Sequence, residues 1–314
     1  MTETKHIPVL LEEILGYFDL KNSKKVLDCT FGGGGHARAF LEASPGVKVV
    51  AIDKDPGAGD RVKDLVGEYG DRLRFYDMSF DELDRIEEDG FDCILFDLGV
   101  SSFQLDEPQR GFSFRHEADV DMRLDPREGL SAGDFLEKAS REDLVKAVRD
   151  YGEELSWGKV VRAIEGARGR GVLGNTQSFA DLVAGAVETK FKGKPSRIHP
   201  ATKTFQGIRM AVNDEIGQIE RALPKAFDKL VIGGILAVIS FHSLEDRLVK
   251  RFFRRMAGRP EHRLDSTPGD MREVYAKMLT SKPIMVGVEE MRINPRSRSA
   301  RLRILKKEKN INYE

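Results

Sequence analysis

The fold is decided by the stretch Val26-Leu27-Asp28-Cys29-Thr30-Phe31-Gly32-Gly33-Gly34-Gly35-His36, in which an apolar segment ending in a carboxylate meets four consecutive glycines. Glycine adopts positive φ angles and has no Cβ, so such a turn lets the backbone approach a ligand closely. A helix expected over residues 37–41 would direct its first N–H groups toward the same ligand. The stretch therefore predicts the nucleotide-binding corner of a doubly wound α/β sheet.

Two cofactor classes fit this corner. Gly32, Gly34 and Ala37, followed by Asp53, match the dinucleotide pattern G-x-G-x-x-G/A with its later acidic residue. Asp28, however, ends the first strand, where its charge would repel a pyrophosphate but attract the ammonium group of an amino acid. S-adenosylmethionine has such a group and no phosphate, so Asp28 favours this cofactor. A nicotinamide oxidoreductase is the competing enzyme class, and a solvated Asp beside an ordinary turn is the structural alternative.

The following segments extend the same site. Residues 47–52 predict a strand ending in Asp53, whose carboxylate would reach the ribose hydroxyls of a ligand in the first corner. Residues 77–80 end in Phe80, an aromatic ring suited to the face of an adenine. Residues 91–96 predict the fourth strand, which delivers Asp97 to the same edge of the sheet.

Eight separate motifs resemble the bacterial small-subunit ribosomal RNA (cytosine-N4)-methyltransferase family, and the resemblance covers about residues 6 to 304. They begin, in chain order, at His6 (HIPVLL), Asp97 (DLGVSS), Arg110 (RGFSF), Asp121 (DMRLDP), Tyr151 (YGEE), His199 (HPATKTFQ), Ser240 (SFHSLEDR) and Asn294 (NPRSRS). The resemblance implies a Rossmann-like class I methyltransferase that uses S-adenosylmethionine. It further implies methylation of the exocyclic N4 amine of one decoding-centre cytidine, within an assembled or nearly assembled small ribosomal subunit.

The family's cofactor-binding positions correspond to Gly34, Gly35, His36, Asp53, Phe80, Asp97 and Gln104 in this sequence. His36 and Gln104 rest on the resemblance alone, whereas the others also follow from the residues themselves. The chain departs from many relatives at Gly33, where they carry a basic residue. We expect this change to leave cofactor binding intact while loosening the loop.

Composition favours a cytoplasmic enzyme that needs no metal. Cys29 and Cys93 both lie in apolar strands, so we expect two buried thiols rather than a disulfide or a metal site. The longest apolar run, residues 230–239, is short and contains two glycines, which predicts a buried strand and no membrane span. The sequence leaves the oligomeric state open, a homodimer included.

The formal net charge of −1 predicts that any contact with RNA is local. Three basic clusters are candidates for phosphate contacts, with solvated surface charge as the alternative interpretation. They are Lys190, Lys192, Lys194, Arg197 and Lys203; Arg247, Lys250, Arg251, Arg254 and Arg255; and Arg296, Arg298, Arg301 and Arg303.

Residues 107–200 lack the alternation of strands and helices and predict an all-helical insertion that recognises the substrate, whereas 1–106 and 201–314 would form a discontinuous methyltransferase core. Ser131, Ser140 and Ser178 each precede an Asp by three residues, a pattern typical of helix starts. We expect the chain to rejoin the core through one helix carrying the apolar positions from 205 to 223. Residues 294–304 would then supply the closing strands.

Methylation of an amine needs the methyl donor and N4 held in line, and an acceptor for the released proton. Asp97 is the best-placed acceptor, although it can instead serve the cofactor, and His242 is a weaker candidate. Leu98-Gly99-Val100 stands where many amino-methyltransferases have Pro-Pro-aromatic, so the ring that stacks on the base stays open between Phe103, Phe112 and Phe114. Neither cysteine is placed for C5 methylation. A ribosome-binding assembly factor without catalysis is the non-enzyme alternative.

Overall fold

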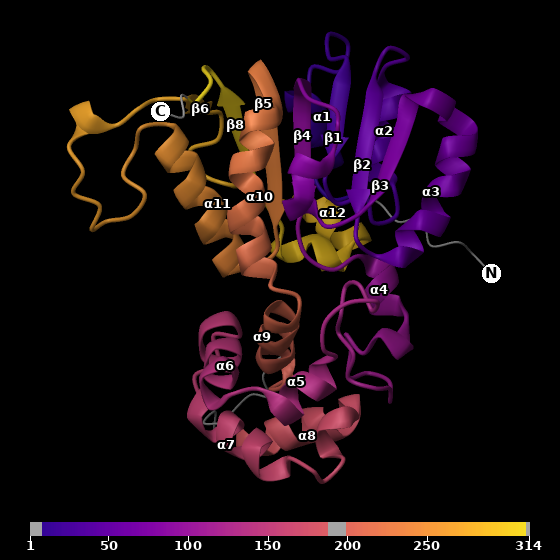
Figure 1. Cartoon of the computed structure of the whole chain (residues 1–314), viewed down its shortest axis with the longest axis vertical. Coiled ribbons are helices and arrows are strands. Elements are labelled where there is room, and N and C mark those ends of the chain that lie inside the picture. The colour runs from indigo at the N-terminus through magenta and orange to yellow at the C-terminus, as the bar shows by residue number, and fades with distance from the viewer. Residues whose placement is uncertain (1–7, 188–198, 312–314) are drawn as a thin grey trace. The chain divides into compact units, whose positions relative to one another are not determined.

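The computed structural model describes residues 8–187 and 199–311 (Figure 1). The chain divides into two compact units. The first combines residues up to Gly99 with those from Ile216 onward, and the second contains Val100–Glu215. The second unit thus begins earlier and ends later than the insertion expected at 107–200.

The first unit is built on a mixed sheet of eight strands with the order β3-β2-β1-β4-β5-β8-β6, and β7 pairs with β8. Neighbouring strands from β3 to β5 are parallel, whereas β8 is antiparallel to β5 and to β6. The strands are β1 Lys25–Asp28, β2 Lys48–Asp53, β3 Leu73–Asp77, β4 Phe91–Asp97, β5 Leu230–Ser240, β6 Ala276–Met278, β7 Ile284–Met285 and β8 Arg301–Lys307. The expected doubly wound α/β fold is confirmed.

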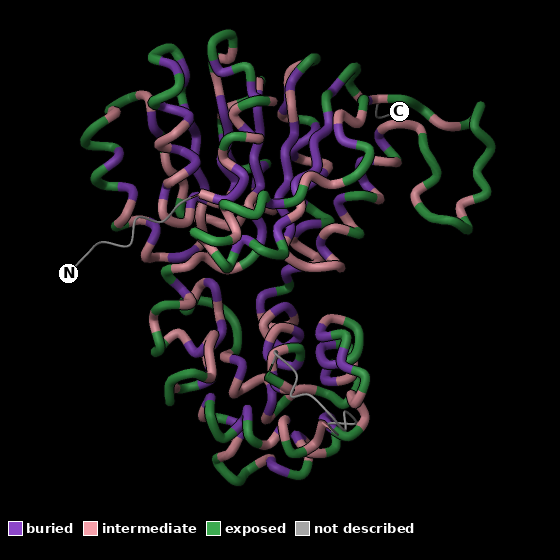
Figure 2. Tube along the Cα trace, turned by 180° about the vertical axis from the view of Figure 1, so that it is seen from behind, coloured by how far each residue is buried: buried purple, intermediate pink, exposed green. Residues whose placement is uncertain are grey.

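Helices cover both faces of this sheet, so the central strands are buried along most of their length (Figure 2). Successive side chains of β1 point to opposite faces: Val26 joins one apolar cluster and Leu27 the other. The helices of the first cluster are α1 Leu11–Tyr17, α2 Gly35–Ala43 and α3 Pro56–Tyr69, and those of the second are α10 Glu215–Lys229 and α11 Ser243–Met256. Burial on both faces explains why these strands read as continuous apolar runs.

The second unit has its own apolar core, made by helices. Its helices are α4 Ser102–Asp106, α5 Ala132–Lys138, α6 Arg141–Val145, α7 Trp157–Ala167, α8 Thr176–Ala186 and α9 Thr202–Val212, with a π-helix over Lys146–Tyr151. Ser131 and Ser140 cap α5 and α6 as expected. The expected cap at Ser178 is wrong, because Asn175 caps α8 by accepting bonds from the N–H groups of Gln177 and Ser178.

The single helix expected from Thr202 to Leu223 is also wrong, because the chain breaks into α9 and α10. Asp214 lies in the left-handed region at φ 47°, and the amide of Asn213 turns away to bind backbone elsewhere in the second unit. As a result Phe205 and Ile208 pack in the helical core, whereas Ile219 and Leu223 pack on the sheet. The apolar positions that the sequence assigned to one helix therefore belong to two helices, α9 in the second unit and α10 on the sheet of the first.

The closing strands expected over 294–304 begin only at Arg301. Residues 295–299 form a 3₁₀ helix whose first N–H groups are capped by Asn294. The sequence did not predict β6 and β7 at the edge of the sheet, because strands of three and two residues are too short to show an alternation of apolar and polar positions. No helix in residues 8–187 or 199–311 is both long and apolar enough to cross a membrane.

Candidate functional site

Four parallel strands end in aspartate at the same edge of the sheet: Asp28 ends β1, Asp53 ends β2, Asp77 ends β3 and Asp97 ends β4. Asp28, Asp53 and Asp97 are the three that belong to the predicted site. The carboxyl edge of such a sheet, beside the loop after its first strand, is where open α/β folds bind their ligands. The predicted site is therefore assembled by backbone topology.

The glycine loop joins β1 to α2 and needs its glycines at defined positions. Gly34 has φ +77°, and a Cβ there would lie 2.6 Å from the ring of Phe31. Gly32 has φ +54° and donates its N–H to Asp53 Oδ2 at 2.7 Å. Arg61 of α3 donates to the carbonyl of Gly32 at 2.8 Å, so the loop is tied to the second strand and its helix.

Asp53 faces the loop with both oxygens. Oδ2 accepts from Gly32, and Oδ1 accepts from the N–H of Asp55 at 2.9 Å. Burial raises the pKa of Asp53, and these two backbone bonds oppose the shift. Each carboxylate oxygen still has a second lone pair, which suits the acceptance of hydrogen bonds from ribose hydroxyls.

Asp28 is only 1% exposed, and its two oxygens differ. Oδ1 accepts the N–H of Thr30 at 3.1 Å, whereas Oδ2 is buried without a hydrogen-bond partner. Burial, helped by the nearby charge of Asp53, raises the pKa of Asp28 to about 7. A buried carboxylate oxygen without a partner costs free energy unless a donor or cation reaches it.

Asp97 repeats this arrangement on β4. Its backbone N–H donates to Thr30 Oγ1 at 2.7 Å, and its Oδ1 is buried without a partner. Burial is the main reason that the pKa of Asp97 rises to about 8, and the negative charges of Asp28, Glu245 and Glu290 add to it. Thr30 thus links Asp28 Oδ1 to the backbone N–H of Asp97, while Asp28 Oδ2 and Asp97 Oδ1 remain without a hydrogen-bond partner.

His36 lies next to Asp97 near the start of α2. Its Nδ1 is 3.8 Å from Asp97 Oδ2, and its Nε2 is 3.0 Å from the carbonyl oxygen of Val9. The ring is 6% exposed. The structure therefore brings together Asp28, Gly32, Asp53, His36 and Asp97, of which His36 rested on family resemblance alone.

The remaining predicted cofactor residues lie in two places. Phe80 packs edge-on against Phe96 of β4, with ring centres 5.6 Å apart. Gln104 belongs to the second unit, where its side chain accepts the N–H of Ser101 at 2.9 Å and caps α4. Its assignment to the cofactor stays a prediction.

His242 has a structural task in the described chain. It is the N-cap of α11, where its Nδ1 accepts the N–H of Leu244 at 3.3 Å. The buried Glu245 completes the cap by accepting the N–H groups of Phe241 and His242. A catalytic part for His242 stays a prediction.

Sequence reasoning missed the segment of Pro8, Val9 and Leu10 as part of the site. A Cβ on Gly35 would lie 3.2 Å from the Pro8 ring, and the N–H of Leu10 donates to Glu290 Oε1 of α12 (Val288–Ile293) at 3.0 Å. Leu10 is fully buried at φ 54°. The only signal was the motif starting at His6, whose first two residues lie outside the described parts.

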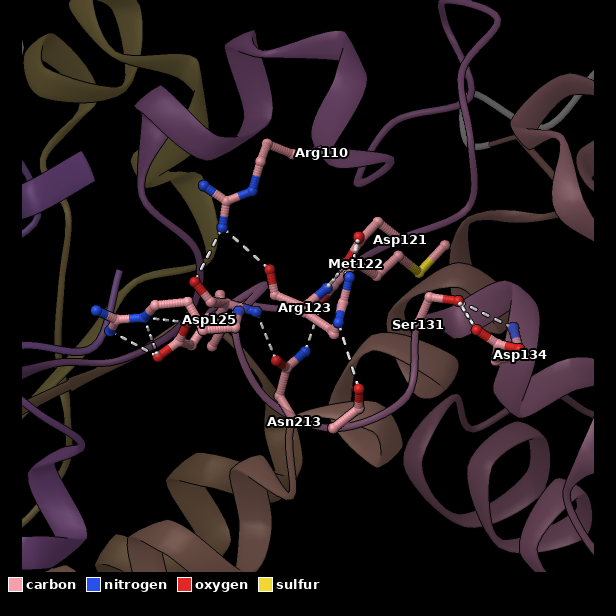
Figure 3. A network of polar contacts seen from close by, with 11 residues as sticks. Arg110, Asp121, Met122, Arg123, Asp125, Ser131, Asp134 and Asn213 are labelled. Atoms are coloured by element: carbon pink, nitrogen blue, oxygen red, sulfur yellow. Dashed lines mark hydrogen bonds and ion pairs between the residues drawn. The ribbon is translucent and has the colours of Figure 1, made fainter. Parts of the chain in front are cut away.

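The second unit holds its DMRLDP motif in a polar network (Figure 3). Arg110 donates to the carbonyls of Arg123 and Leu124, and Asn213 binds the carbonyl of Met122 and the N–H of Leu124. Arg123 pairs with Asp121 at 2.7 Å. Charged side chains here fix the backbone of a loop.

The three candidate aromatic rings differ in their surroundings. Phe114 packs 5.0 Å from Phe205 and 4.6 Å from His199 within the helical core. The Arg110 guanidinium lies 5.8 Å from the centre of the Phe112 ring. Phe103, on α4, is 37% exposed and is the best of the three for stacking on a base.

The three basic clusters differ in how exposed their side chains are. In the third cluster, Arg303 is buried and binds Asp246 at 2.6 Å, and Arg301 approaches the same carboxylate at 3.7 Å. Lys190, Lys192, Lys194 and Arg197 lie outside the described residues. The cluster on α11 exposes Arg247, Lys250 and Arg255 and is the best remaining phosphate contact.

The strand order, with antiparallel β8 between β5 and β6, and the acid-ended strands at the glycine corner define a class I S-adenosylmethionine-dependent methyltransferase. The model of the MraW methylase family matches residues 3–308, and the chain belongs to that family. This result confirms the family resemblance found in the sequence.

Curated relatives match nearly the whole chain. "Ribosomal RNA small subunit methyltransferase H" of Methylorubrum extorquens is 45% identical over 307 residues, covering 96% of this chain and 86% of the relative. The protein of the same name from Nostoc sp. is 42% identical over 303 residues, covering 96% and 93%. A solved structure titled as a putative rRNA-methylase, from Clostridium thermocellum, is 12% identical, covers 98% and 99%, and superposes with a TM-score of 0.44.

The described residues fit this cofactor. The orphaned oxygens of Asp28 and Asp97 suit cationic groups, because S-adenosylmethionine carries an ammonium and a sulfonium. The glycine loop leaves no side chain between its backbone and a ligand. Asp53 supplies acceptors for the ribose.

Proposed function

We propose that this chain transfers the methyl group of S-adenosylmethionine to the exocyclic N4 amine of a specific cytidine in small-subunit ribosomal RNA. The observation that carries the proposal is the pair of buried carboxylate oxygens without partners, on Asp28 and Asp97, beside the glycine loop. The names of the curated relatives support the RNA substrate.

The two cysteine thiols favour methylation of the N4 amine over methylation of carbon C5 of the same base. Methylation of C5 needs a cysteine nucleophile, which reacts as its thiolate. Burial raises the pKa of Cys93 to about 12 and that of Cys29 well above its ordinary value. Both thiols are therefore inert at neutral pH, whereas N4 needs only an acceptor for its proton.

Each residue of the corner has a task in this reaction. Asp28 would bind the ammonium group, Asp53 the ribose hydroxyls, and the backbone at Gly34 would lie close to the cofactor. When bound, the cofactor supplies an electrophilic methyl group. Asp97 holds the acceptor oxygen toward which the N4 proton is released, and positioning provides about 7 to 11 kcal/mol of the barrier reduction.

The second unit and the basic face of α11 are our candidates for RNA recognition. Arg247, Lys250 and Arg255 offer charges to phosphates, which position a nucleic acid without reading its bases. Phe103 offers a ring for the base. We place the substrate in an assembled or nearly assembled small subunit in the cytoplasm.

The test uses small ribosomal subunits from a strain that lacks this enzyme. Purified protein and labelled S-adenosylmethionine are added, the RNA is digested, and its nucleosides are separated by mass. We expect N4-methylcytidine as the product. Label in 5-methylcytidine would refute the assigned atom, and binding without transfer to any subunit would favour the assembly-factor alternative. Binding of NADH but not of S-adenosylhomocysteine would refute the cofactor.

A further inference from the structure

The corner holds more acid than base. The acidic groups that face Asp97 from the surrounding elements are Asp28 on β1, Glu245 on α11 and Glu290 on α12, with Asp53 on β2 beside Asp28. The basic groups nearby have partners of their own: Arg61 binds Asp55, and Arg303 binds Asp246. Among the described residues, the imidazole of His36 on α2 lies beside Asp97, with its Nδ1 3.8 Å from Asp97 Oδ2.

The geometry of His36 fixes where its hydrogen lies. A carbonyl oxygen accepts and cannot donate, so Nε2, at 3.0 Å from the Val9 oxygen, carries the hydrogen of the neutral ring. Nδ1 then presents a lone pair toward Asp97 Oδ2 at 3.8 Å. Two acceptors that face each other favour a proton on one of them.

Building on the proposed function, we propose that the cluster of Asp28, His36 and Asp97 exchanges a proton for the positive charge of the cofactor's sulfonium. The cluster releases a proton when S-adenosylmethionine binds, and it takes up the amine proton during methyl transfer. It therefore distinguishes the charged cofactor from its uncharged-sulfur product, S-adenosylhomocysteine.

The step balances in atoms and charge. N4 donates its lone pair to the methyl carbon, the electron pair of the breaking C–S bond stays on sulfur, and one N4–H proton moves to the carboxylate of Asp97. Before the step the positive charge of the sulfonium would be balanced by the carboxylate of Asp97, and afterwards a neutral thioether would accompany a neutral carboxylic acid. The net charge of the buried corner is unchanged, so no uncompensated charge has to be buried.

The proton affinities of the free protein suit this exchange. Burial holds the pKa of Asp28 at about 7 and that of Asp97 at about 8, so near neutral pH the cluster carries protons that a cation can displace. The ammonium group is common to both ligands. Only the sulfonium distinguishes them, and it is expected to displace the additional proton.

Affinity measurements at several pH values test the proposal. Displacement of one proton changes an affinity by at most tenfold per pH unit, so we expect the preference for S-adenosylmethionine over S-adenosylhomocysteine to rise by about 10- to 30-fold from pH 6.0 to 7.5. Titration calorimetry at pH 7.0, in buffers of low and high ionisation enthalpy, counts the released protons directly. We expect a larger count with S-adenosylmethionine.

Two variants locate the effect. Asp97→Asn should remove most of the pH dependence of the preference, whereas Asp60→Asn, at an exposed position on α3, should keep it. The amino groups of the two ligands also titrate, but they do so identically with every variant, so their contribution cancels when a variant is compared with the unaltered protein. Asp28→Asn serves as the second cluster variant if Asp97→Asn does not fold.

Equal proton counts for the two ligands in the unaltered protein would overturn the proposal while leaving the methyltransferase assignment intact. A pH-dependent preference that persists in both Asp97→Asn and Asp28→Asn would also overturn it. Failure of the unaltered protein to bind either ligand would instead refute the proposed function, and the inference with it.

Discussion

Asp53→Ala tests the ribose contact most directly. The carboxylate accepts two backbone N–H groups, at 2.7 Å and 2.9 Å, and is proposed to accept hydrogen bonds from the ribose. A hydrogen bond to a charged group contributes about 1.5 to 3 kcal/mol. Loss of the ribose contact should therefore raise the Kd for S-adenosylhomocysteine by roughly 10- to 150-fold.

The same substitution also frees the N–H groups of Gly32 and Asp55, so the loop can loosen. Arg61→Met is the matched control, because Arg61 also ties the loop through the carbonyl of Gly32 but offers no acceptor to the ribose. We expect Arg61→Met to raise the Kd several-fold less than Asp53→Ala does.

Calorimetric titration with S-adenosylhomocysteine and its 2′-deoxy analogue completes the design. Removal of the hydroxyl should weaken binding to the unaltered protein but hardly affect Asp53→Ala, because the acceptor is already gone. An unchanged Kd in folded Asp53→Ala, or an equal effect of the missing hydroxyl in both proteins, would refute the ribose assignment.

Three further predictions follow from the same contacts. Gly34→Val should abolish cofactor binding, because the backbone at this position has φ +77° and a Cβ would lie 2.6 Å from the Phe31 ring. The control Gly67→Ala on α3 should bind the cofactor normally, because a Cβ there would have nothing within 4 Å. Normal binding by Gly34→Val would contradict the role assigned to the loop. Asp97→Asn should slow single-turnover transfer at saturating cofactor by about 100-fold or more; a normal rate with a raised cofactor Kd would make Asp97 a cofactor ligand only. Lys307→Met should lower the free energy of unfolding, measured in urea, by about 2 to 3 kcal/mol, because the buried ammonium donates to the carbonyls of Phe227, Asp228 and Leu230. The control Lys309→Met, at an exposed position, should change this free energy by less than about 0.5 kcal/mol. Equal unfolding midpoints for the two variants would count against a stabilising role of the Lys307 contacts.

The sheet and its acid-ended strands could be predicted because strand periodicity, glycine turns and strand-end acids are local signals. The ends of β1, β2 and β4 follow from their apolar runs, and parallel topology alone brings Asp28, Asp53 and Asp97 to one edge. These residues needed no knowledge of distant contacts.

The parts that were wrong or missed depend on contacts between distant residues. The break between α9 and α10 is set by Asn213, which binds residues about 90 positions earlier in the chain. Glu290 reaches Leu10 across 280 positions. Arg303, placed by the sequence in a cluster considered for phosphate contacts, is buried and paired with Asp246. Periodicity carries no information about such partners.

The chemistry of the acid positions explains why two carboxyl groups, each with one buried oxygen that lacks a partner, suit a cation-binding site. Asparagine would fill nearly the same space at positions 28 and 97 with a smaller desolvation cost, but it could neither balance a cation nor take up a proton. Aspartate makes the free corner less stable, and that cost is offset only when positive charge arrives. Ligand binding should therefore stabilise this unit against unfolding by mass action, provided that the unfolded chain binds neither ligand. At equal ligand concentrations near neutral pH, S-adenosylmethionine should raise Tm more than S-adenosylhomocysteine to the extent that its Kd is lower, and in Asp97→Asn this difference in Tm should shrink because the variant cannot exchange the proton.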